Sequence, residues 1–159
     1  MNCTILCIGK LKERYWSEAC GEYLKRLNAY CKPQIIELAE YRLPDSPSPA
    51  QIEKALEQEG AAILQRLPAG SLLISLCVEG EHLSSEAFSE ALSRYAVGGT
   101  SSFTFAVGGS FGLSEAVKRQ SARRLSMSDM TFPHQLARVM LLEQLYRAFS
   151  IQAHTKYHK

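Results

Sequence analysis

The sequence lacks both the long hydrophobic segment of a membrane protein and the paired cysteines of a secreted one. No apolar run approaches the ~18 residues of a transmembrane helix, and no basic segment with a cleavage site opens the chain, so we expect neither a membrane span nor a signal peptide. The five cysteines include no Cys-x-x-Cys pair, and an odd number is atypical of a disulfide framework. We therefore predict reduced thiols, a cytoplasmic location and no membrane partner.

The sequence also lacks the best-known signatures of metal and nucleotide sites. No spacing of histidine and cysteine resembles a zinc site, so we predict no metal. Gly108, Gly109 and Gly112 form a glycine loop, but no Gly-Lys-Ser/Thr follows as in a Walker loop. Their spacing, and their place after the fourth predicted strand, also differ from the dinucleotide-binding fingerprint. A tight strand-to-helix turn explains these glycines as well as a ligand does.

Positive charge is concentrated at the end of a chain of otherwise ordinary composition. The 159 residues are 46% hydrophobic and 21% charged, which is typical of one globular domain spanning residues 1–159. Residues 1–109 carry 10 Lys or Arg and 13 Asp or Glu, a balance of −3, whereas residues 110–159 carry 8 and 3, a balance of +5. This basic C-terminal third suits an anionic partner such as nucleic acid, although random variation of surface charge is the simpler alternative.

Apolar, strand-like runs alternate with helical patterns along the whole chain. We expect strands at 3–8, 34–38, 72–78, 102–107 and 125–128, and helices at 11–30, 49–67, 84–97, 113–123 and 133–152. The strand at 72–78 is almost wholly apolar, which indicates a central strand covered on both faces. Five strands that alternate with five helices predict an α/β fold, a mainly parallel sheet with helices on both faces.

Two strand ends in the C-terminal half carry the clearest functional signal. The strand at 102–107 stops at the glycine loop, and the short strand at 125–128 runs into a segment that ends at Pro133 and His134. Open α/β sheets bind ligands at the carboxyl ends of their strands, and glycines let backbone approach a ligand, so these ends predict a small-molecule site made mostly of backbone. His134 is either a polar residue at a helix start or a ring that points into this site.

The last helix and the tail after it suggest contacts with a second copy and with RNA. Apolar residues cover more than one face of the helix, which favours burial against both the sheet and a symmetry-related copy, hence a homodimer. Glu143 and Arg147 are four residues apart and are expected to pair. The tail, residues 154–159, is basic and partly aromatic, which suits stacking on RNA bases and contact with phosphate, although disorder is the default for a terminus.

Several motifs, taken together, point to a known family. They are Ile8-Gly9-Lys10-Leu11-Lys12, Gly108-Gly109-x-x-Gly112-Leu113, Met130-Thr131-Phe132-Pro133-His134-Gln135, Glu143-Gln144-x-Tyr146-Arg147-Ala148 and Tyr157-His158-Lys159. In these motifs and in its length the chain resembles the RlmH family of SPOUT methyltransferases. The resemblance implies an α/β fold whose C-terminal part forms a deep trefoil knot, a topology that sequence patterns do not reveal.

The resemblance also implies an activity, a cofactor and partners. The expected protein is a homodimeric enzyme that transfers a methyl group from S-adenosylmethionine to N3 of a pseudouridine in a loop of 23S ribosomal RNA, within the assembled ribosome. The cofactor-binding positions that the resemblance implies are Leu76, Gly108, Met127, Ser128, Asp129, Met130, Thr131 and Phe132. All of them fall at the carboxyl ends of predicted strands, which agrees with the argument from the strands.

Methylation at N3 requires a group that takes the proton from that nitrogen. Glu143 and His158 are the candidates for this base, and Tyr157 is expected to act beside His158 in catalysis or in gripping the target base. Four positive side chains suggest contacts with RNA phosphates: Arg138, Arg147, Lys156 and Lys159. Two other classes stay open, a small-molecule α/β enzyme that uses the same glycine loop and a non-catalytic RNA-binding protein of the ribosome.

Overall fold

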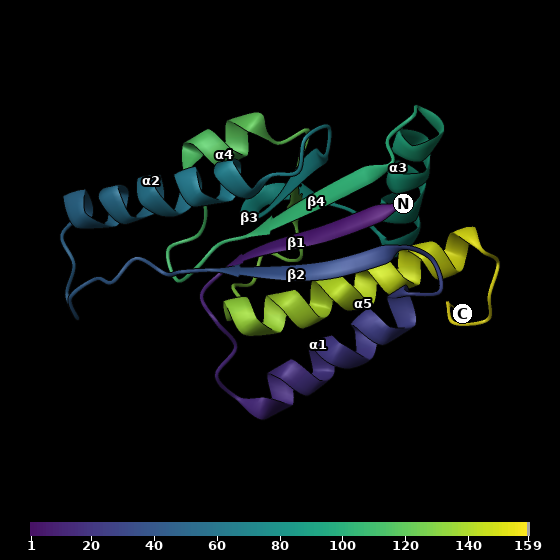
Figure 1. Ribbon diagram of the computed structural model, residues 1–159, viewed down its shortest axis with the longest axis horizontal. Helices are drawn as coiled ribbons and strands as arrows, with labels where there is room; N and C mark the ends of the chain where they lie inside the picture. Colours follow the sequence, from purple (N-terminus) through teal and green to yellow (C-terminus); the bar gives the residue numbers. More distant parts are fainter. Residues whose placement is uncertain (159) are drawn as a thin grey trace.

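The computed structural model describes residues 1–158, in which strands and helices alternate strictly (Figure 1). The elements are β1 (Asn2–Ile8), α1 (Arg14–Leu27), β2 (Lys32–Leu38), α2 (Pro49–Arg66), β3 (Leu72–His82), α3 (Ser85–Val97), β4 (Ser102–Val107), α4 (Glu115–Gln120), β5 (Arg123–Ser126) and α5 (His134–Gln152). The predicted type and order of these elements are confirmed, and their bounds differ by a few residues. Lys159, one of the predicted phosphate contacts, lies outside the described residues.

The strands form one parallel sheet in the order β2-β1-β4-β3-β5, which confirms the predicted α/β fold. β1 and β4 pair with each other in the interior of the sheet, and apart from their first residues both are buried throughout. Because all five strands run in the same direction, their carboxyl ends meet along one edge of the sheet.

Helices cover both faces of the sheet, as predicted. α1, α3 and α5 pack together on one face, where Leu142 of α5 shares a core with Phe105 of β4. α2 and α4 lie on the opposite face, where Ile63 and Val117 belong to a second core (Figure 1). None of the described helices is long and apolar enough to cross a membrane.

β3 extends to His82, four residues beyond the predicted strand. The sequence did not indicate this extension, because its residues are polar and show no strand pattern. The strand shifts register between Leu76 and Glu81, and its far end pairs with Leu125 and Ser126 of β5. Gly80 permits this close pairing, since a Cβ there would lie 2.6 Å from the carbonyl carbon of Leu125. Because of this register shift, the polar end of β3 also pairs with the end of β5.

The helices begin in two different ways. Ser48 caps α2 through a reciprocal pair of hydrogen bonds: Gln51 N donates to Ser48 Oγ at 3.3 Å, and Ser48 N donates to Gln51 Oε1 at 2.8 Å. α5 instead begins directly after Pro133 without a side-chain cap. Its start is positioned by packing and by buried polar contacts, which are described below.

Candidate functional site

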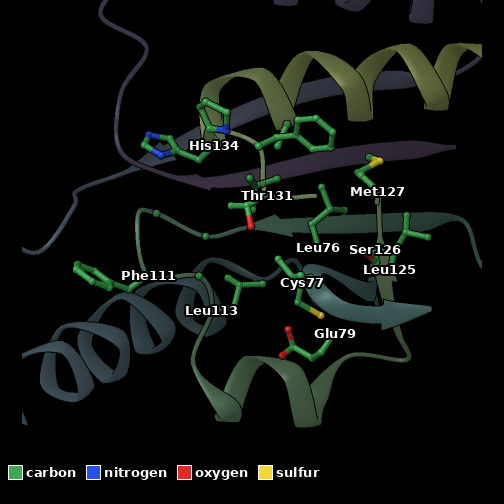
Figure 2. A pocket seen from close by; sticks show the side chains of 18 of the residues that line it. Leu76, Cys77, Glu79, Phe111, Leu113, Leu125, Ser126, Met127, Thr131 and His134 are labelled. Atoms are coloured by element: carbon green, nitrogen blue, oxygen red, sulfur yellow. The ribbon is translucent and has the colours of Figure 1, made fainter. Parts of the chain in front are cut away.

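A cavity of about 780 Å³ opens where β3, β4 and β5 end, beside the first turn of α5 (Figure 2). Its walls combine the apolar side chains of Leu76, Leu125 and Met127 with the backbone of the glycine loop. Small-molecule sites commonly enclose about 300–1,000 Å³ within such mainly apolar walls. The cavity lies at the strand ends that the sequence singled out.

Most of the residues predicted to bind the cofactor line this one cavity. They are Leu76, Gly108, Met127, Ser128, Met130, Thr131 and Phe132. The exception is Asp129, whose side chain is 96% exposed and whose carboxylate lies 3.5 Å from Nε2 of His82. The structure thus gathers residues from three separate segments into one wall and turns Asp129 to solvent.

The glycine loop is shaped by its own backbone. A Cβ on Gly108 would lie 2.2 Å from the carbonyl oxygen of Gly112, so only glycine lets the loop close on itself. Gly112 adopts a φ of 85°, and its N–H donates to the carbonyl of Gly109 at 3.1 Å. The sequence offered two explanations for Gly108, a tight turn and the close approach of a ligand. The tight turn alone is enough to require glycine at this position.

His134 is a wall residue for which the sequence left two roles open. Its ring lines the cavity from the start of α5 (Figure 2). Burial is the main cause that lowers the pKa of His134, and the positive charge of Arg138 acts in the same direction, while Glu40 opposes them. The ring is therefore neutral at pH 7 and adds no positive charge to the cavity.

Lys118 and Glu79 are wall residues that the sequence analysis missed. Lys118, in α4, forms an ion pair with Glu79 of β3, and its Nζ lies 3.3 Å from Oε1 of Glu115. Their positions carried a signal: Glu79 directly follows the apolar run of β3, and Lys118 lies in the helix that follows the glycine loop. Both places belong to the carboxyl edge of the sheet, where ligands bind.

Arg138 is buried, although its charge suggested a contact with RNA. None of its surface is exposed, and its guanidinium donates to the carbonyls of Ile8 and Gly9, both at 2.8 Å, and to Oε1 of Glu37 at 3.0 Å. The same carboxylate oxygen accepts the N–H of Leu11 at 2.9 Å. Arg138 thus fixes the loop after β1 from inside. Its position argues against the predicted phosphate contact, because a phosphate has no access to this guanidinium.

The three predicted catalytic residues and Arg147 form a second group at the other end of α5. Tyr157 Oη and Arg147 Nε both donate to Oε1 of Glu143, at 3.1 and 3.0 Å, so the expected pair of Glu143 and Arg147 is present. The ring of His158 adjoins them, with Nδ1 3.4 Å from Nη1 of Arg147 and Nε2 2.8 Å from Oε1 of Glu86. We call Glu143, Arg147, Tyr157 and His158 the tail cluster.

Protonation states within the tail cluster follow from its contacts. Burial, followed by the effects of Tyr23 and Glu143, raises the pKa of Tyr157 to about 12, so the phenol keeps its proton at pH 7. The hydrogen bond with Glu143 raises the pKa of Arg147, which stays charged. Tyr157 is therefore a hydrogen-bond donor rather than a base. Lys156, the exposed residue before it, is the remaining predicted phosphate contact within the described residues.

The cavity adjoins the first turn of α5, whereas the tail cluster lies toward the other end of this helix, next to the C-terminal tail. Figure 1 shows the two ends of α5 far apart along one face of the sheet. Ala137, which lines the cavity, and Arg147 are ten residues apart on this helix. At ~1.5 Å per residue this is about 15 Å along the helix axis. Within one chain the structure therefore brings the predicted cofactor positions together and the predicted catalytic residues together, but it keeps the two groups apart.

Comparison with known proteins decides which family this arrangement belongs to. The sequence matches a family model described as "Predicted SPOUT methyltransferase" over residues 1–158. The chain belongs to the SPOUT methyltransferase family. Because the match reaches residue 158, it includes both the cavity and the tail cluster of this SPOUT methyltransferase.

Curated relatives agree with the family assignment over 97% or more of their length. A protein of Pelotomaculum thermopropionicum is 51% identical over 155 residues, 98% of this chain and 97% of the relative. Proteins of Bifidobacterium animalis subsp. lactis and Leuconostoc mesenteroides subsp. mesenteroides are 45% and 43% identical over the whole of both chains. All three carry the name Ribosomal RNA large subunit methyltransferase H, which confirms the resemblance to the RlmH family.

The two groups of this SPOUT methyltransferase suit different chemical tasks. The cavity offers apolar side chains and backbone polar groups, which are suited to hold a flat heterocycle. The tail cluster offers a phenol donor, a guanidinium and an imidazole, which are suited to bind a polar partner and to move a proton. Among residues 1–158, no group of three or more His, Cys, Asp or Glu side chains is arranged to hold a metal ion.

Proposed function

We propose that this SPOUT methyltransferase transfers a methyl group from S-adenosylmethionine to N3 of a pseudouridine in a loop of 23S ribosomal RNA. The cavity at the strand ends, with seven of the expected cofactor positions in its wall, carries the proposal. The name of the relatives supports ribosomal RNA as the substrate. The assembled ribosome, and hence the cytoplasm, is the proposed setting. The C-terminal trefoil knot, within one domain of residues 1–159, is proposed on the same family grounds.

The residues of the cavity fit S-adenosylmethionine in chemistry and in volume. Backbone amides and carbonyls at Gly108 and in segment 127–132 suit the polar edge of adenine, and Met127 and Phe132 suit its faces. S-adenosylmethionine, when bound, supplies a methyl group that its sulfonium makes electrophilic. A neutral His134 suits that positive charge better than an imidazolium would. The task of the surrounding residues is then to align the methyl group with the nitrogen that receives it.

His158 is the base that the geometry favours for the proton on N3. Glu143 already accepts from Arg147 and Tyr157, and a pKa of about 12 keeps Tyr157 protonated. We therefore assign the proton to His158, and we assign to Tyr157 a hydrogen bond to the target base or stacking against it. Phosphate contacts are proposed for three side chains of this region: Arg147, Lys156 and Lys159.

A homodimer accounts for the distance between the cavity and the tail cluster. α5 is apolar over a wide arc, and Val139, Met140 and Tyr146 stay partly exposed on it. When two copies pack through this helix around a twofold axis perpendicular to it, the end of α5 in one copy lies beside the start of α5 in the other. We propose that each tail cluster completes the cavity of the partner copy in this way.

The proposed function is tested by incubating the protein with methyl-labelled S-adenosylmethionine and either intact ribosomes or free 23S RNA. We expect label on N3 of one pseudouridine in ribosomes. The variant Ala137→Trp, which fills the cavity from α5, is expected to abolish transfer, while Lys54→Ala on the exposed side of α2 leaves it unchanged. Binding to ribosomes without transfer would identify a non-catalytic RNA-binding protein. Transfer to small molecules alone would identify the other class that the sequence left open.

A further inference from the structure

Glu86 contacts the tail cluster from a different helix. It lies in the first turn of α3, where acidic side chains are common because they complement the helix dipole. Its Oε1 atom nevertheless lies 2.8 Å from Nε2 of His158, a residue 72 positions further along the chain. Hydrogen bonds with its own backbone amide, with Ser84 and with His158, in that order, lower the pKa of the Glu86 carboxyl. Glu86 therefore presents a carboxylate to the imidazole at neutral pH.

Hydrogen bonds hold Glu86 in place by fixing α3 to α5. Ser85 Oγ donates to Oε1 of Gln144 at 2.7 Å, and Ser89 Oγ donates to the carbonyl of Ala148 at 2.8 Å. Both bonds join α3 to the half of α5 that carries the tail cluster. Glu86, next to Ser85 in the chain, therefore belongs to the same rigid frame as the cluster that it contacts.

The partners of the His158 ring select one tautomer. A carboxylate only accepts, so Nε2 beside Glu86 carries the hydrogen; a guanidinium only donates, so Nδ1 turns its lone pair to Arg147. Glu86 from α3 and Arg147 from α5 are the charged groups that face the ring, and Glu143 and Tyr157 stand behind Arg147. The basic atom of His158 is therefore Nδ1, and its ring is oriented from the opposite side by a carboxylate.

We propose that Glu86 is a positioning residue for methyl transfer, which holds His158 in the Nε2–H tautomer so that Nδ1 takes the proton from N3 of the target base. This inference rests on the proposed function. The N3–H bond breaks and its proton goes to Nδ1; N3 forms a bond to the methyl carbon, and the bond from that carbon to sulfur breaks with its electron pair left on sulfur. The resulting imidazolium lies against the Glu86 carboxylate. The target base takes the place of Arg147 at Nδ1, which frees the guanidinium for phosphate.

A spectroscopic test reports the tautomer without any turnover. Heteronuclear NMR of the full-length protein with isotope-labelled histidine distinguishes the two neutral tautomers, and His158→Ala identifies the signal of interest. We expect the Nε2–H form at His158 in the native protein and a weaker preference for it in Glu86→Gln, because Arg147 still faces Nδ1 but the amide can present either a donor or an acceptor to Nε2. The matched control is Glu90→Gln, an exposed glutamate one turn further along α3, which should leave the signal unchanged. A native His158 with its hydrogen on Nδ1 would overturn the proposal.

Kinetics on ribosomes test whether the orientation matters for the reaction. We expect Glu86→Gln to lower kcat at least about 10-fold, with the KM for S-adenosylmethionine unchanged, and Glu86→Asp to restore part of the loss. In a His158→Ala background Glu86→Gln should have no further effect.

The outcomes separate this inference from the function on which it rests. If the native protein methylates ribosomes and Glu86→Gln keeps both its kcat and the Nε2–H preference of His158, the positioning role is wrong and the proposed function stands. If the native protein transfers no methyl group to ribosomes, the proposed function itself fails, and the tautomer measured by NMR still decides whether Glu86 orients His158.

Discussion

The two halves of α5 each carry an arginine that pairs with a glutamate, and the two arginines differ in burial and in their other partners. Near the start, Arg138 is fully buried and binds two backbone carbonyls and Glu37. Nine residues later, Arg147 keeps 26% of its side chain exposed and contacts Glu143 and His158. The first arginine builds the frame beside the cavity. The second belongs to a group of side chains available to a partner.

This difference teaches that the environment of a charge, rather than its presence on a helix, decides its role. Under the proposal of a site shared between copies, one chain holds two halves of a site. The start of α5 adjoins a cavity suited to a cofactor but lies far from the base proposed for the proton, His158. The end of α5 has the base but lies far from the cavity. The predictions below test this division.

The largest expected effect is the loss of activity when the tail is removed. Deleting residues 157–159 takes away the proposed base and leaves the cavity intact, because none of the tail residues up to His158 lines it. We expect methyl transfer to ribosomes to fall at least about 100-fold, the low end of what a positioned acid–base group contributes. Calorimetry should show unchanged affinity for S-adenosylmethionine. A truncated protein with near-normal turnover would show that the second half of the site lies elsewhere.

Substitution of the two arginines should separate stability from activity. Arg138→Met leaves Glu37 and two carbonyls without their donor. Removing one partner of a buried pair costs about 3–5 kcal/mol, and because Glu37 is 31% exposed we expect the lower end of this range. Arg147→Met should cost at most about 1 kcal/mol, as for surface pairs, and should lower transfer instead. Urea unfolding and methyl-transfer assays of both variants test this prediction. A larger loss of stability in Arg147→Met than in Arg138→Met would contradict it.

A smaller effect is expected when the glycine loop is changed. The Cβ of Gly108→Ala would collide with the carbonyl of Gly112, so the loop has to open, and we expect about 10-fold weaker binding of S-adenosylmethionine by calorimetry. Gly21→Ala is the control, because no atom lies within 4 Å of a Cβ at that helical position. It should stabilise the protein by up to about 1 kcal/mol and leave the affinity unchanged. Equal affinities for both variants would mean that loop closure does not matter to the cavity.

The smallest effect concerns pH and the start of α5. Burial lowers the pKa of His134 in the folded state, so the unfolded chain takes up the proton more readily as the solution is acidified. Its contribution to stability is therefore lost as pH falls through the ordinary range of histidine, near 6.5. In urea titrations at several pH values, the native protein should lose stability on acidification relative to His134→Gln. If the free energy of unfolding changes with pH in the same way for both proteins, burial does not lower the pKa of His134.

The order of the elements was predictable because each strand and helix shows its periodicity within a few residues. The last part of β3 was not, since Glu79–His82 has no apolar pattern and forms a strand only against β5. Part of the cavity wall followed from motifs at strand ends and from the family resemblance, whereas Lys118 and Glu79 were missed. The burial of Arg138 did not, because its partners lie 101 or more positions away in the chain. The contact between Glu86 and His158 is long-range in the same way and left no local signal.

A heterodimer with two different defects tests most directly whether the site is shared between copies. One chain carries Ala137→Trp and keeps its tail, and the other lacks residues 157–159 and keeps its cavity. If each tail cluster completes the cavity of the partner copy, one of the two sites is intact, and the purified heterodimer should transfer methyl groups to ribosomes at about half the native rate. Each homodimer of a single variant should be inactive. A heterodimer as inactive as these homodimers would contradict the shared site. It would indicate that each tail acts on the cavity of its own chain.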